Sequence, residues 1–521
     1  MNTDSRPGYI HPQQEKWGTR LLLRVPEPWR ATLDQRWRAR MQHETWRAAN
    51  IDLLQLSEEL RPQWLRLAAS DAAVNALAVT MAAATDASVR RLDCDRKAVA
   101  LIARACAVLD IQPPSARLKS SGTAPAIARA TDPRWWRRSL RYRSGRAVEH
   151  AAATLGEGPS RTAPYCTDLT LKRRRQQHAR NRATLAGLVA VSSDGDQIDL
   201  SELADKSGAN PINRSAEMLV RLRGIERTAD QAGDACIFVT LTAPGHMHPR
   251  TNGARSQNPS WTGETPAAAQ AHLARVWART RAELARHNIT ARGMRVAEPH
   301  KDGTPHWHLL IWLPPDQSAQ TVHILRKHAM ADTPDEPGAA AHRLKVEHID
   351  RARGSAVGYV IKYLAKHLPS KGARTVGDDA DEGDAPQDAR DRIDAWAAVW
   401  SIRRFQFFGV APVTLWRELR RRQDDDTPDP GPTLTAAATA AETPDWSAFE
   451  QIAGPVPYQR ARATITQWME PAEPTHPGTA ATDRYGEARP DRLVGLYAID
   501  GHRRTRMKTW SIQAAPERRA A

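Results

Sequence analysis

The chain has 521 residues, 41% of them hydrophobic, which is enough for roughly two to four domains and a full core in at least one. Its 75 Lys and Arg against 59 Asp and Glu leave a net charge of +16, which favours a nucleic-acid partner, although an Arg- and Ala-rich genome would give the same excess. The four cysteines lack C-x-x-C spacing and no apolar window of about 18 residues stands out, so we expect a cytoplasmic protein without a zinc ribbon, disulfide framework, export signal or membrane segment.

Residues 1–125 are predicted to form a mainly helical N-terminal domain. Apolar residues recur at helical spacing after Trp29, in the Ala-rich stretch 71–92 and again in 95–110, and Pro113 and Pro114 end the pattern. No motif in this region indicates a chemical function, and recognition of DNA or of a protein partner are equally open roles.

Residues 126–225 are predicted to be a basic helical segment that contacts DNA. Aromatic and basic side chains alternate in DPRWWRRSLR, which contains Arg134, Trp135, Trp136, Arg137 and Arg138. Arginines can neutralise phosphates while tryptophans stack on unpaired bases, a mixture that suits single-stranded nucleic acid. The alternative is an amphipathic helix that buries its tryptophans and exposes its arginines, and the sequence does not decide between the two.

Residues 226–425 are predicted to form an α+β domain, because strand patterns begin to alternate with helical ones. The order βαββαβ is the split pattern that builds a four-stranded antiparallel sheet with helices on one face and with the first and third strands in the centre. The expected strands are 236–244, 291–299, 306–314 and 343–350, and the expected helices are 265–288, 316–330 and 353–368.

Two later segments have compositions typical of irregular structure. The acidic stretch 371–394 contains Gly and Pro and is expected to be a surface loop. Residues 426–521 begin with a Pro- and Asp-rich linker, and we expect them to continue as a weakly structured, partly disordered basic tail.

The stretch PHWHLLIW contains a candidate metal site. His306 and His308 open a predicted strand, whose period of two points both imidazoles to one face and Trp307 to the other. A second H-x-H, at His246 and His248, lies among Gly and Pro where a loop is expected. Histidines that merely cap strand ends remain the alternative for His306 and His308.

A third ligand is expected from the preceding strand of the same hairpin. If the loop has an odd number of residues, as with DGT or KDGTP, Glu298 aligns with His308 and His300 with His306; an even loop turns Glu298 to the other face. Glu298 is therefore the predicted third ligand and His300 the reserve. Two imidazoles and a carboxylate also suit zinc or non-haem iron, so the ligands do not name the metal.

The stretch GYVIKYLAKH places two tyrosines one helical turn apart. Tyr359 and Tyr363 would present their hydroxyls on one face of a helix, where a core-facing aromatic pair is the alternative. Beside a cation that polarises a phosphate, either hydroxyl could attack a phosphodiester and form a phosphotyrosine ester. Lys362 could pair with the phosphate. The alternative is a solvated lysine, because its position on the helix points it away from the face of the two tyrosines.

These motifs together resemble a known family. FVTLT, PHWHLLIW and YVIKY, in this order, resemble the three motifs of the HUH endonucleases, and the two-tyrosine form with WWRRSLR upstream and SIRRFQFFGVAPVTLWRELRR downstream is similar to the bacteriophage replication gene A proteins. The resemblance covers roughly 130–425 and implies a ferredoxin- or RRM-like HUH catalytic domain. It maps the metal ligands onto His306 and His308 and the nucleophiles onto Tyr359 and Tyr363.

The resemblance implies an initiator of rolling-circle replication in a bacterial host. Such an enzyme nicks one DNA strand at the phage origin, remains on the 5′ end and later rejoins the strand. Its DNA ligand is single-stranded origin DNA, its cofactor is Mg²⁺ or Mn²⁺, and its partners are a host helicase and DNA polymerase. The alternatives are a plasmid relaxase or single-strand transposase with the same chemistry, a non-catalytic nucleic-acid-binding protein, and an iron oxygenase, which the basic charge disfavours.

Overall fold

The computed structural model describes residues 10–25, 27–60, 70–116, 122–251, 253–358, 386–421, 429–474 and 480–516. The chain forms two compact units, of which unit 1 holds residues 1–159 and 472–490 and unit 2 holds residues 160–471 and 491–521. The domain boundaries after residues 125, 225 and 425 stay predictions.

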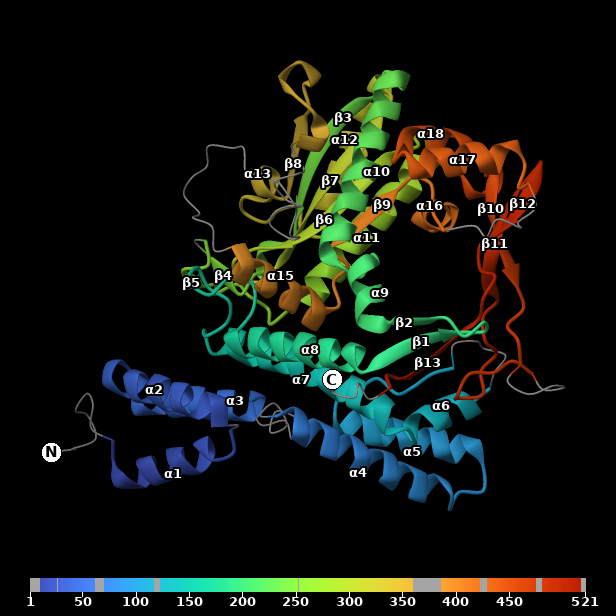
Figure 1. Cartoon of the computed structure of the whole chain (residues 1–521). Coiled ribbons are helices and arrows are strands. Elements are labelled where there is room, and N and C mark those ends of the chain that lie inside the picture. The colour runs from blue at the N-terminus through green and yellow to red at the C-terminus, as the bar shows by residue number, and fades with distance from the viewer. Residues whose placement is uncertain are drawn as a thin grey trace, which may run out of the picture. The chain divides into compact units, whose positions relative to one another are not determined.

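Unit 1 is built of helices, as the periodicity of its sequence predicts (Figure 1). Buried tryptophans anchor it, and each donates a hydrogen bond from its indole: Trp37 Nε1 to Asn50 Oδ1 at 2.9 Å and Trp136 Nε1 to the carbonyl of Ala130 at 2.7 Å. Its helices are α1 (Pro12–Leu22), α2 (Glu27–His43), α3 (Trp46–Glu59), α4 (Asp71–Val89), α5 (Asp95–Val108), α6 (Ala124–Ala130) and α7 (Pro133–Thr154).

Helix α7 corrects part of the predicted DNA contact. Trp135 is 8% exposed and Trp136 is fully buried, so neither indole offers a free face to a base, whereas Arg134, Arg137 and Arg138 are exposed. The helix buries a stripe at a spacing of three and four residues, and the tryptophans belong to that stripe. The amphipathic alternative is therefore the correct interpretation of the tryptophans, and DNA contact by the three arginines stays a prediction.

Helix α4 is long and apolar enough to cross a membrane by length and composition alone. A single helix of this kind is weak evidence for a membrane segment. The helix buries Val74, Ala78 and Ala82, and Asp71 at its start accepts two hydrogen bonds of 2.7 Å from Arg141 of α7. These contacts are those of a helix packed within unit 1.

Unit 2 is organised around a five-stranded antiparallel sheet with the order β8-β3-β7-β6-β9. The strands are β3 (Ala235–Thr242), β6 (Arg292–Pro299), β7 (Pro305–Leu313), β8 (Leu344–His348) and β9 (Phe405–Phe408). Helix α11 (Pro266–Arg286) lies between β3 and β6 in the chain and α12 (Ser318–Met330) between β7 and β8. The predicted α+β class and the central positions of the first and third strands are confirmed.

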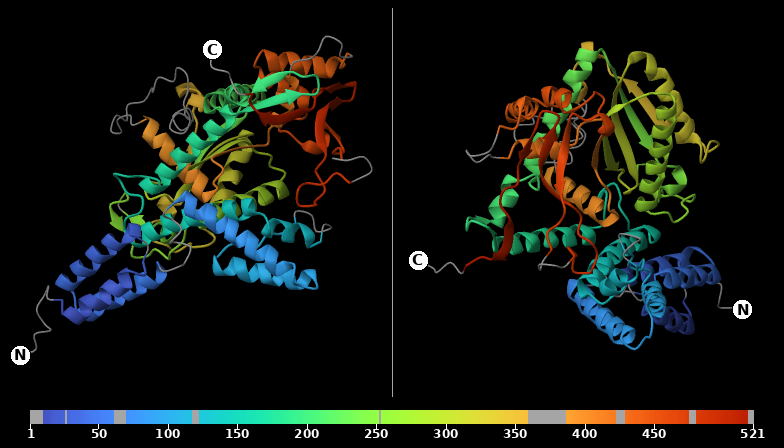
Figure 2. Two further views of the ribbon diagram at one scale, coloured as in Figure 1. Left: turned by 60° about the horizontal axis from the view of Figure 1, so that its bottom comes forward. Right: turned by 90° about the vertical axis from the view of Figure 1, so that its right-hand side faces the viewer.

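Helices cover both faces of this sheet, and not one face as predicted (Figure 2). On one face Trp307, Leu309 and Ile311 share a core with Leu273 and Val276 of α11. On the other face, Leu310 and Trp312 share a core with α10 (Pro211–Ala232), α16 (Val413–Leu419), α17 (Pro432–Glu442) and α18 (Trp446–Ala453). A central strand that is apolar at every position, as β7 is after its histidines, requires cover on both sides.

The predicted weakly structured tail is wrong for its described residues. Leu434, Trp446 and Phe449 are almost completely buried in α17 and α18. A three-stranded sheet follows with the order β10-β11-β12, from β10 (Ile465–Glu470), β11 (Arg492–Ala498) and β12 (Gly501–Arg504). The Ala- and Thr-rich composition concealed these helices, because buried alanines give little hydrophobic contrast.

The remaining elements of unit 2 include two smaller sheets. A second three-stranded sheet has the order β13-β1-β2, and β4 pairs with β5. These elements are α8 (Asp168–Ala186), β1 (Leu188–Ser192), β2 (Gln197–Asp199), α9 (Leu200–Lys206), β4 (Arg250–Thr251), β5 (Ser256–Gln257), α13 (Ala339–His342), α15 (Pro386–Trp400) and β13 (Trp510–Ala514).

Candidate metal centre

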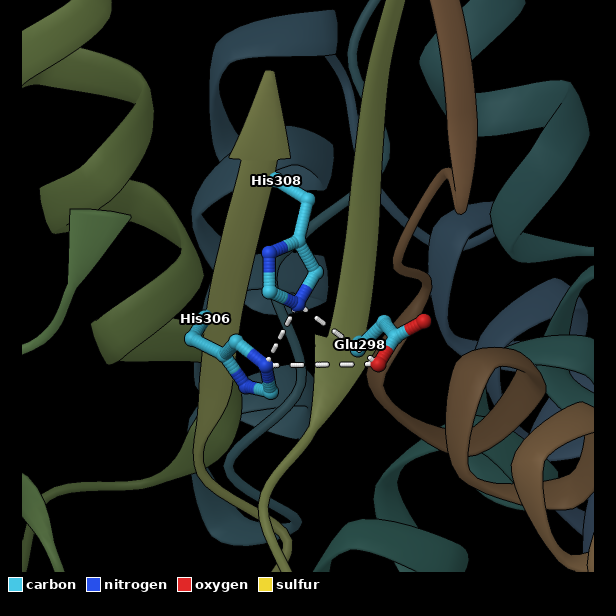
Figure 3. Close-up of side chains that lie close together, drawn as sticks. All are labelled: Glu298, His306 and His308. Carbon is cyan, nitrogen blue, oxygen red and sulfur yellow. Dashed lines mark hydrogen bonds and ion pairs between the residues drawn. The ribbon is translucent and has the colours of Figure 1, made fainter. Parts of the chain in front are cut away.

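The hairpin β6–β7 brings three predicted metal ligands together. Glu298, His306 and His308 each offer one ligand atom, and these atoms all lie within 4.8 Å of one another (Figure 3). The Nε2 atoms of the two histidines are 2.9 Å apart, and Glu298 Oε2 lies 4.0 Å from His306 Nε2 and 3.7 Å from His308 Nε2. All three side chains are largely buried at the end of the sheet.

These distances fit a divalent cation. Neighbouring ligands on an octahedral ion with bonds of ~2.1 Å are roughly 3 Å apart. The two imidazole nitrogens already have this separation, and the carboxylate needs to approach by about 1 Å. Two neutral imidazoles and one carboxylate leave further coordination positions for phosphate oxygens or water.

The register of the hairpin differs from the predicted one. Glu298 pairs with His306 and Val296 with His308, because the loop runs from His300 to Thr304. The predicted odd loop length is confirmed, and Glu298 shares the face of the histidines for that reason. The predicted alignment of Glu298 with His308 is wrong, and His300 lies in the loop instead of pairing with His306.

Thr240 on the central strand β3 contacts Nδ1 of His308, while Glu298 and His306 lie near Nε2 of the same ring. Its Oγ1 lies 3.1 Å from His308 Nδ1, since Thr240 and His308 are directly paired across β3 and β7. If His308 Nε2 binds a cation through its lone pair, the ring proton sits on Nδ1 and is donated to Thr240. The sequence analysis placed FVTLT on a strand but missed this role, which pairing across the sheet would have revealed.

The loop His300–Thr304 is held by partners from three other parts of unit 2. Trp396 Nε1 donates to the carbonyl of Gly303 at 2.7 Å, and the backbone N–H of Tyr165 donates to the carbonyl of Lys301 at 3.1 Å. His248 Nδ1 lies 2.9 Å from Asp302 Oδ2. These contacts fix the turn that sets the hairpin register.

His248 and His300 add two imidazoles beside the three converging ligands. The ring of His300 lies 4.1 Å from that of His306 and 5.1 Å from that of His248, measured between ring centroids. Burial and the neighbouring imidazoles lower the pKa of His300 well below its ordinary value. The second H-x-H, set aside as a loop motif, thus supplies one residue to this region, while His246 faces Glu264 at 3.4 Å.

The predicted nucleophiles Tyr359 and Tyr363, together with Lys362, lie outside the described residues. The chain before them becomes helical at residues 356–358, three residues after the predicted helix start at 353. The hydroxyl of Ser355 accepts from the N–H of Gly358 at 3.3 Å, and Glu226 Oε1 accepts from the N–H of Ala356 at 2.6 Å. A carboxylate at a helix N-terminus stabilises that terminus.

The first turn of this helix belongs to the core on the histidine side of the sheet. Ala356 and Val357 share a buried cluster with Leu310 and Trp312, which alternate along β7 with the same phase as His306 and His308. The chain therefore enters the segment of Tyr359 from the face that carries the three ligands.

The acidic stretch at 371–394, expected to be a surface loop, ends in a helix. Its described part opens α15, whose acidic side chains meet the basic helix α8. Arg174 pairs with Asp394 at 2.6 Å and Arg175 pairs with Asp391 at 2.7 Å. These acidic residues neutralise two arginines of α8.

The fold and the three converging ligands define an α+β protein with a carboxylate and two histidines on one hairpin of a central antiparallel sheet. The family model of the bacteriophage replication gene A protein (GPA) matches residues 66–371, which is more than half of the chain. The chain therefore belongs to the bacteriophage replication gene A protein family. No solved structure matches the chain significantly.

Curated relatives support the same family. A replication protein of Haemophilus phage HP1 is 34% identical over 409 residues, which are 77% of this chain and 50% of that protein. The replication gene A protein of Escherichia phage 186 is 38% identical over 307 residues, 58% of this chain and 44% of that protein. A probable replication endonuclease of Salmonella paratyphi A is 30% identical over 298 residues, 57% of this chain and 37% of that protein. The matches thus span half or less of these relatives.

Proposed function

We propose that this chain is a metal-dependent DNA nicking and joining enzyme that initiates rolling-circle replication of a phage genome. The observation that carries the proposal is the convergence of Glu298, His306 and His308 in a member of the replication gene A family. The names of the three relatives refer to replication, which favours this role over plasmid transfer or transposition.

The proposed chemistry is transfer of a phosphoryl group to tyrosine. A divalent cation, Mg²⁺ or Mn²⁺, would polarise the non-bridging oxygens of the scissile phosphate. The hydroxyl of Tyr363 or Tyr359 gives up its proton as its oxygen attacks phosphorus in line, the bond to the 3′ oxygen breaks, and the 3′ oxygen takes up a proton to leave as a 3′-OH. The 5′ phosphate stays on the tyrosine, and attack by a 3′-OH reverses the step and rejoins the strand.

The chain's own residues have distinct parts in this scheme. His306, His308 and Glu298 would hold the cation, and Thr240 would fix the ring of His308. Glu226 orders the helical residues 356–358, which precede both tyrosines in the chain, and Lys362 would pair with the phosphate. The exposed Arg134, Arg137 and Arg138 would bind the phosphate backbone, and a helicase and DNA polymerase of the bacterial host would extend the nicked strand in the cytoplasm.

The test is an adduct that survives SDS. The protein is incubated with single-stranded DNA from the cognate phage, labelled on either side of the cleavage site, with Mn²⁺ or with EDTA. We expect an adduct on the 5′-phosphate side only, formed with Mn²⁺ and lost in the Tyr359→Phe, Tyr363→Phe double variant. Tyr142→Phe is the matched control, because Tyr142 is exposed in unit 1.

Two results would reject the proposal. The first is the absence of any adduct on cognate DNA from folded protein with Mn²⁺, which would favour a non-catalytic DNA-binding protein. The second is an adduct that persists in EDTA or in the His306→Ala, His308→Ala double variant, which would exclude the metal from the reaction.

A further inference from the structure

The outer face of the β10–β11–β12 sheet carries a cluster of aromatic side chains. Thr466, Tyr497 and His502 are paired across the three strands, and Trp468, Gly495 and Arg504 form the next row. Paired residues in antiparallel strands have their side chains on the same face. These two rows therefore share one face, which we call the aromatic face.

The aromatic face points away from the core of unit 2. Val494 and Leu496, which alternate with Gly495 and Tyr497 along β11, are almost completely buried on the opposite face. On the aromatic face Tyr497 is 42% exposed, His502 is exposed and Trp468 is partly exposed. The sheet can be followed beside α16–α18 in Figure 1.

The rings on this face form a continuous group. Ring centroids are 4.9 Å apart between Trp468 and Tyr497, 5.2 Å between Trp468 and His502, and 5.8 Å between Tyr497 and His502. The guanidinium of Arg504 lies 5.4 Å from the centre of the Trp468 ring and is fixed there by hydrogen bonds of 2.8 and 3.0 Å to Glu470. The cluster is therefore an ordered platform with a cation at its edge.

Basic residues outnumber acidic ones in the sheet and in the turn that precedes it. Arg492 and Arg504 belong to the sheet, and the exposed Arg460 and Arg462 lie in the turn just before β10, against a single acidic residue of the three strands, Glu470. Asp500 of the β11–β12 turn is engaged elsewhere, since its carboxylate accepts from the N–H of Thr433 at 2.9 Å. This excess of positive charge complements a polyanion such as a nucleic acid.

We infer that the aromatic face is a binding surface for single-stranded DNA, on which Trp468 and Tyr497 stack with unpaired bases while the flanking arginines contact phosphates. Aromatic side chains on adjacent strands of a sheet stack on two or three bases in this way, and any base can be accepted because each has a π-face. Duplex DNA does not offer its base faces and is not the expected ligand.

This surface is separate from the hairpin that carries the candidate metal ligands. It also lies beyond residues 66–371, which the family model matches. Binding here needs neither a metal nor bond cleavage, so the inference does not rest on the proposed nicking activity. If both proposals hold, the chain binds single-stranded DNA at the aromatic face as well as at the candidate metal site.

The test measures fluorescence anisotropy of a labelled thymidine oligonucleotide of about 16 nucleotides with the full chain in EDTA, so that cleavage is absent. We expect Tyr497→Ala to weaken single-strand binding by roughly tenfold and a Trp468→Ala, Tyr497→Ala double variant to weaken it further. Binding of a duplex of equal length should not change. Trp510→Ala is the matched control, because Trp510 is an exposed tryptophan of the other three-stranded sheet.

A second measurement keeps the inference testable if the double variant misfolds. Wild-type protein is cross-linked by light to an oligonucleotide that contains 5-iodouracil, and cross-linked peptides are located by mass spectrometry. Cross-links at Trp468 or Tyr497 support the inference. Cross-links found only in other peptides, or unchanged binding by folded Tyr497→Ala protein, overturn it, whatever the adduct assay shows.

Discussion

Replacing Thr240 by Val should weaken metal binding without changing the fold. The hydroxyl of Thr240 lies 3.1 Å from His308 Nδ1 and is the partner that fixes the imidazole with Nε2 toward Glu298 and His306. Valine has nearly the same shape and favours strands, so β3 should keep its place between β7 and β8. The perturbation is therefore confined to one hydrogen bond behind a proposed ligand.

The expected loss is 10- to 100-fold in Mn²⁺ affinity, or ~1.4–2.7 kcal/mol, which is the usual effect of removing a hydrogen bond behind a metal-bound histidine. Affinity is measured by isothermal titration and by electron paramagnetic resonance of free Mn²⁺, in the absence of DNA. Thr240→Ser keeps the hydroxyl and is expected to bind within a few-fold of wild type. Thermal unfolding followed by circular dichroism checks that both variants are folded.

Wild-type affinity in Thr240→Val would refute this reasoning. His308 would then be oriented by packing alone, for which the ring of Phe238 is the available partner, since it stacks on His308 with a centroid distance of 5.4 Å. Equal losses in Thr240→Ser and Thr240→Val would also refute it, because the serine variant retains the hydrogen-bonding group.

Three further predictions concern stability. Gly293→Ala should lower the free energy of unfolding by more than about 2 kcal/mol and weaken Mn²⁺ binding. Gly293 has φ +156°, and a Cβ there would lie 1.9 Å from the carbonyl oxygen of Leu310 in the same hairpin. Urea unfolding that matches wild type would contradict this prediction. Burial raises the pKa of Glu450 from 4.5 to about 7, so the folded chain holds the proton more tightly and stability should fall by the order of 3 kcal/mol as the pH rises through that window. Glu450→Gln, compared by urea unfolding at both ends of the window, should lack this fall, and an identical pH dependence would show that another group causes it. Trp136→Ala should destabilise unit 1 by about 3–5 kcal/mol while Arg137→Ala stays within about 0.5 kcal/mol, and equal effects would contradict the buried placement of the tryptophan.

The central sheet was predictable because its strands and helices have distinct periodicities. The strand 306–314 is apolar at every position after its histidines, which indicates a central strand, and the structure places it between β3 and β6. The helix expected at 265–288 begins at Pro266 with Thr265 as its N-cap and buries Leu273, Val276 and Leu284 on one face.

The hairpin register could not be predicted because sequence gives the parity of a loop more readily than the residue at its centre. An odd loop centred on Gly303, as predicted, and one centred on Asp302, as observed, both place Glu298 on the histidine face. The observed position of the loop is selected by tertiary partners, namely Trp396 at Gly303 and His248 at Asp302, which lie far away in the sequence. The same holds for Thr240, whose place beside His308 depends on the pairing of β3 with β7.

One pattern had two physical explanations, and one surface gave no pattern in the sequence. Tryptophans among arginines suit both a stacking surface and an amphipathic helix, and burial of Trp136 decides for the helix. The aromatic residues of β10–β12 gave no sequence signal, because Trp468 and Tyr497 are 29 positions apart and meet only when the strands pair. Composition alone described that region as a tail.

The three converging ligands come from a single hairpin that spans residues 298–308. Closing so short a loop costs little chain entropy, so the three ligands lie close together in any hairpin of this parity, while the tertiary contacts of the turn select their register. The proximity of the ligands is therefore a local property of the chain. Substitutions in those helices of unit 2 that do not contact the turn will change how much of the protein is folded at a given temperature, while each folded molecule keeps the same ligand spacing.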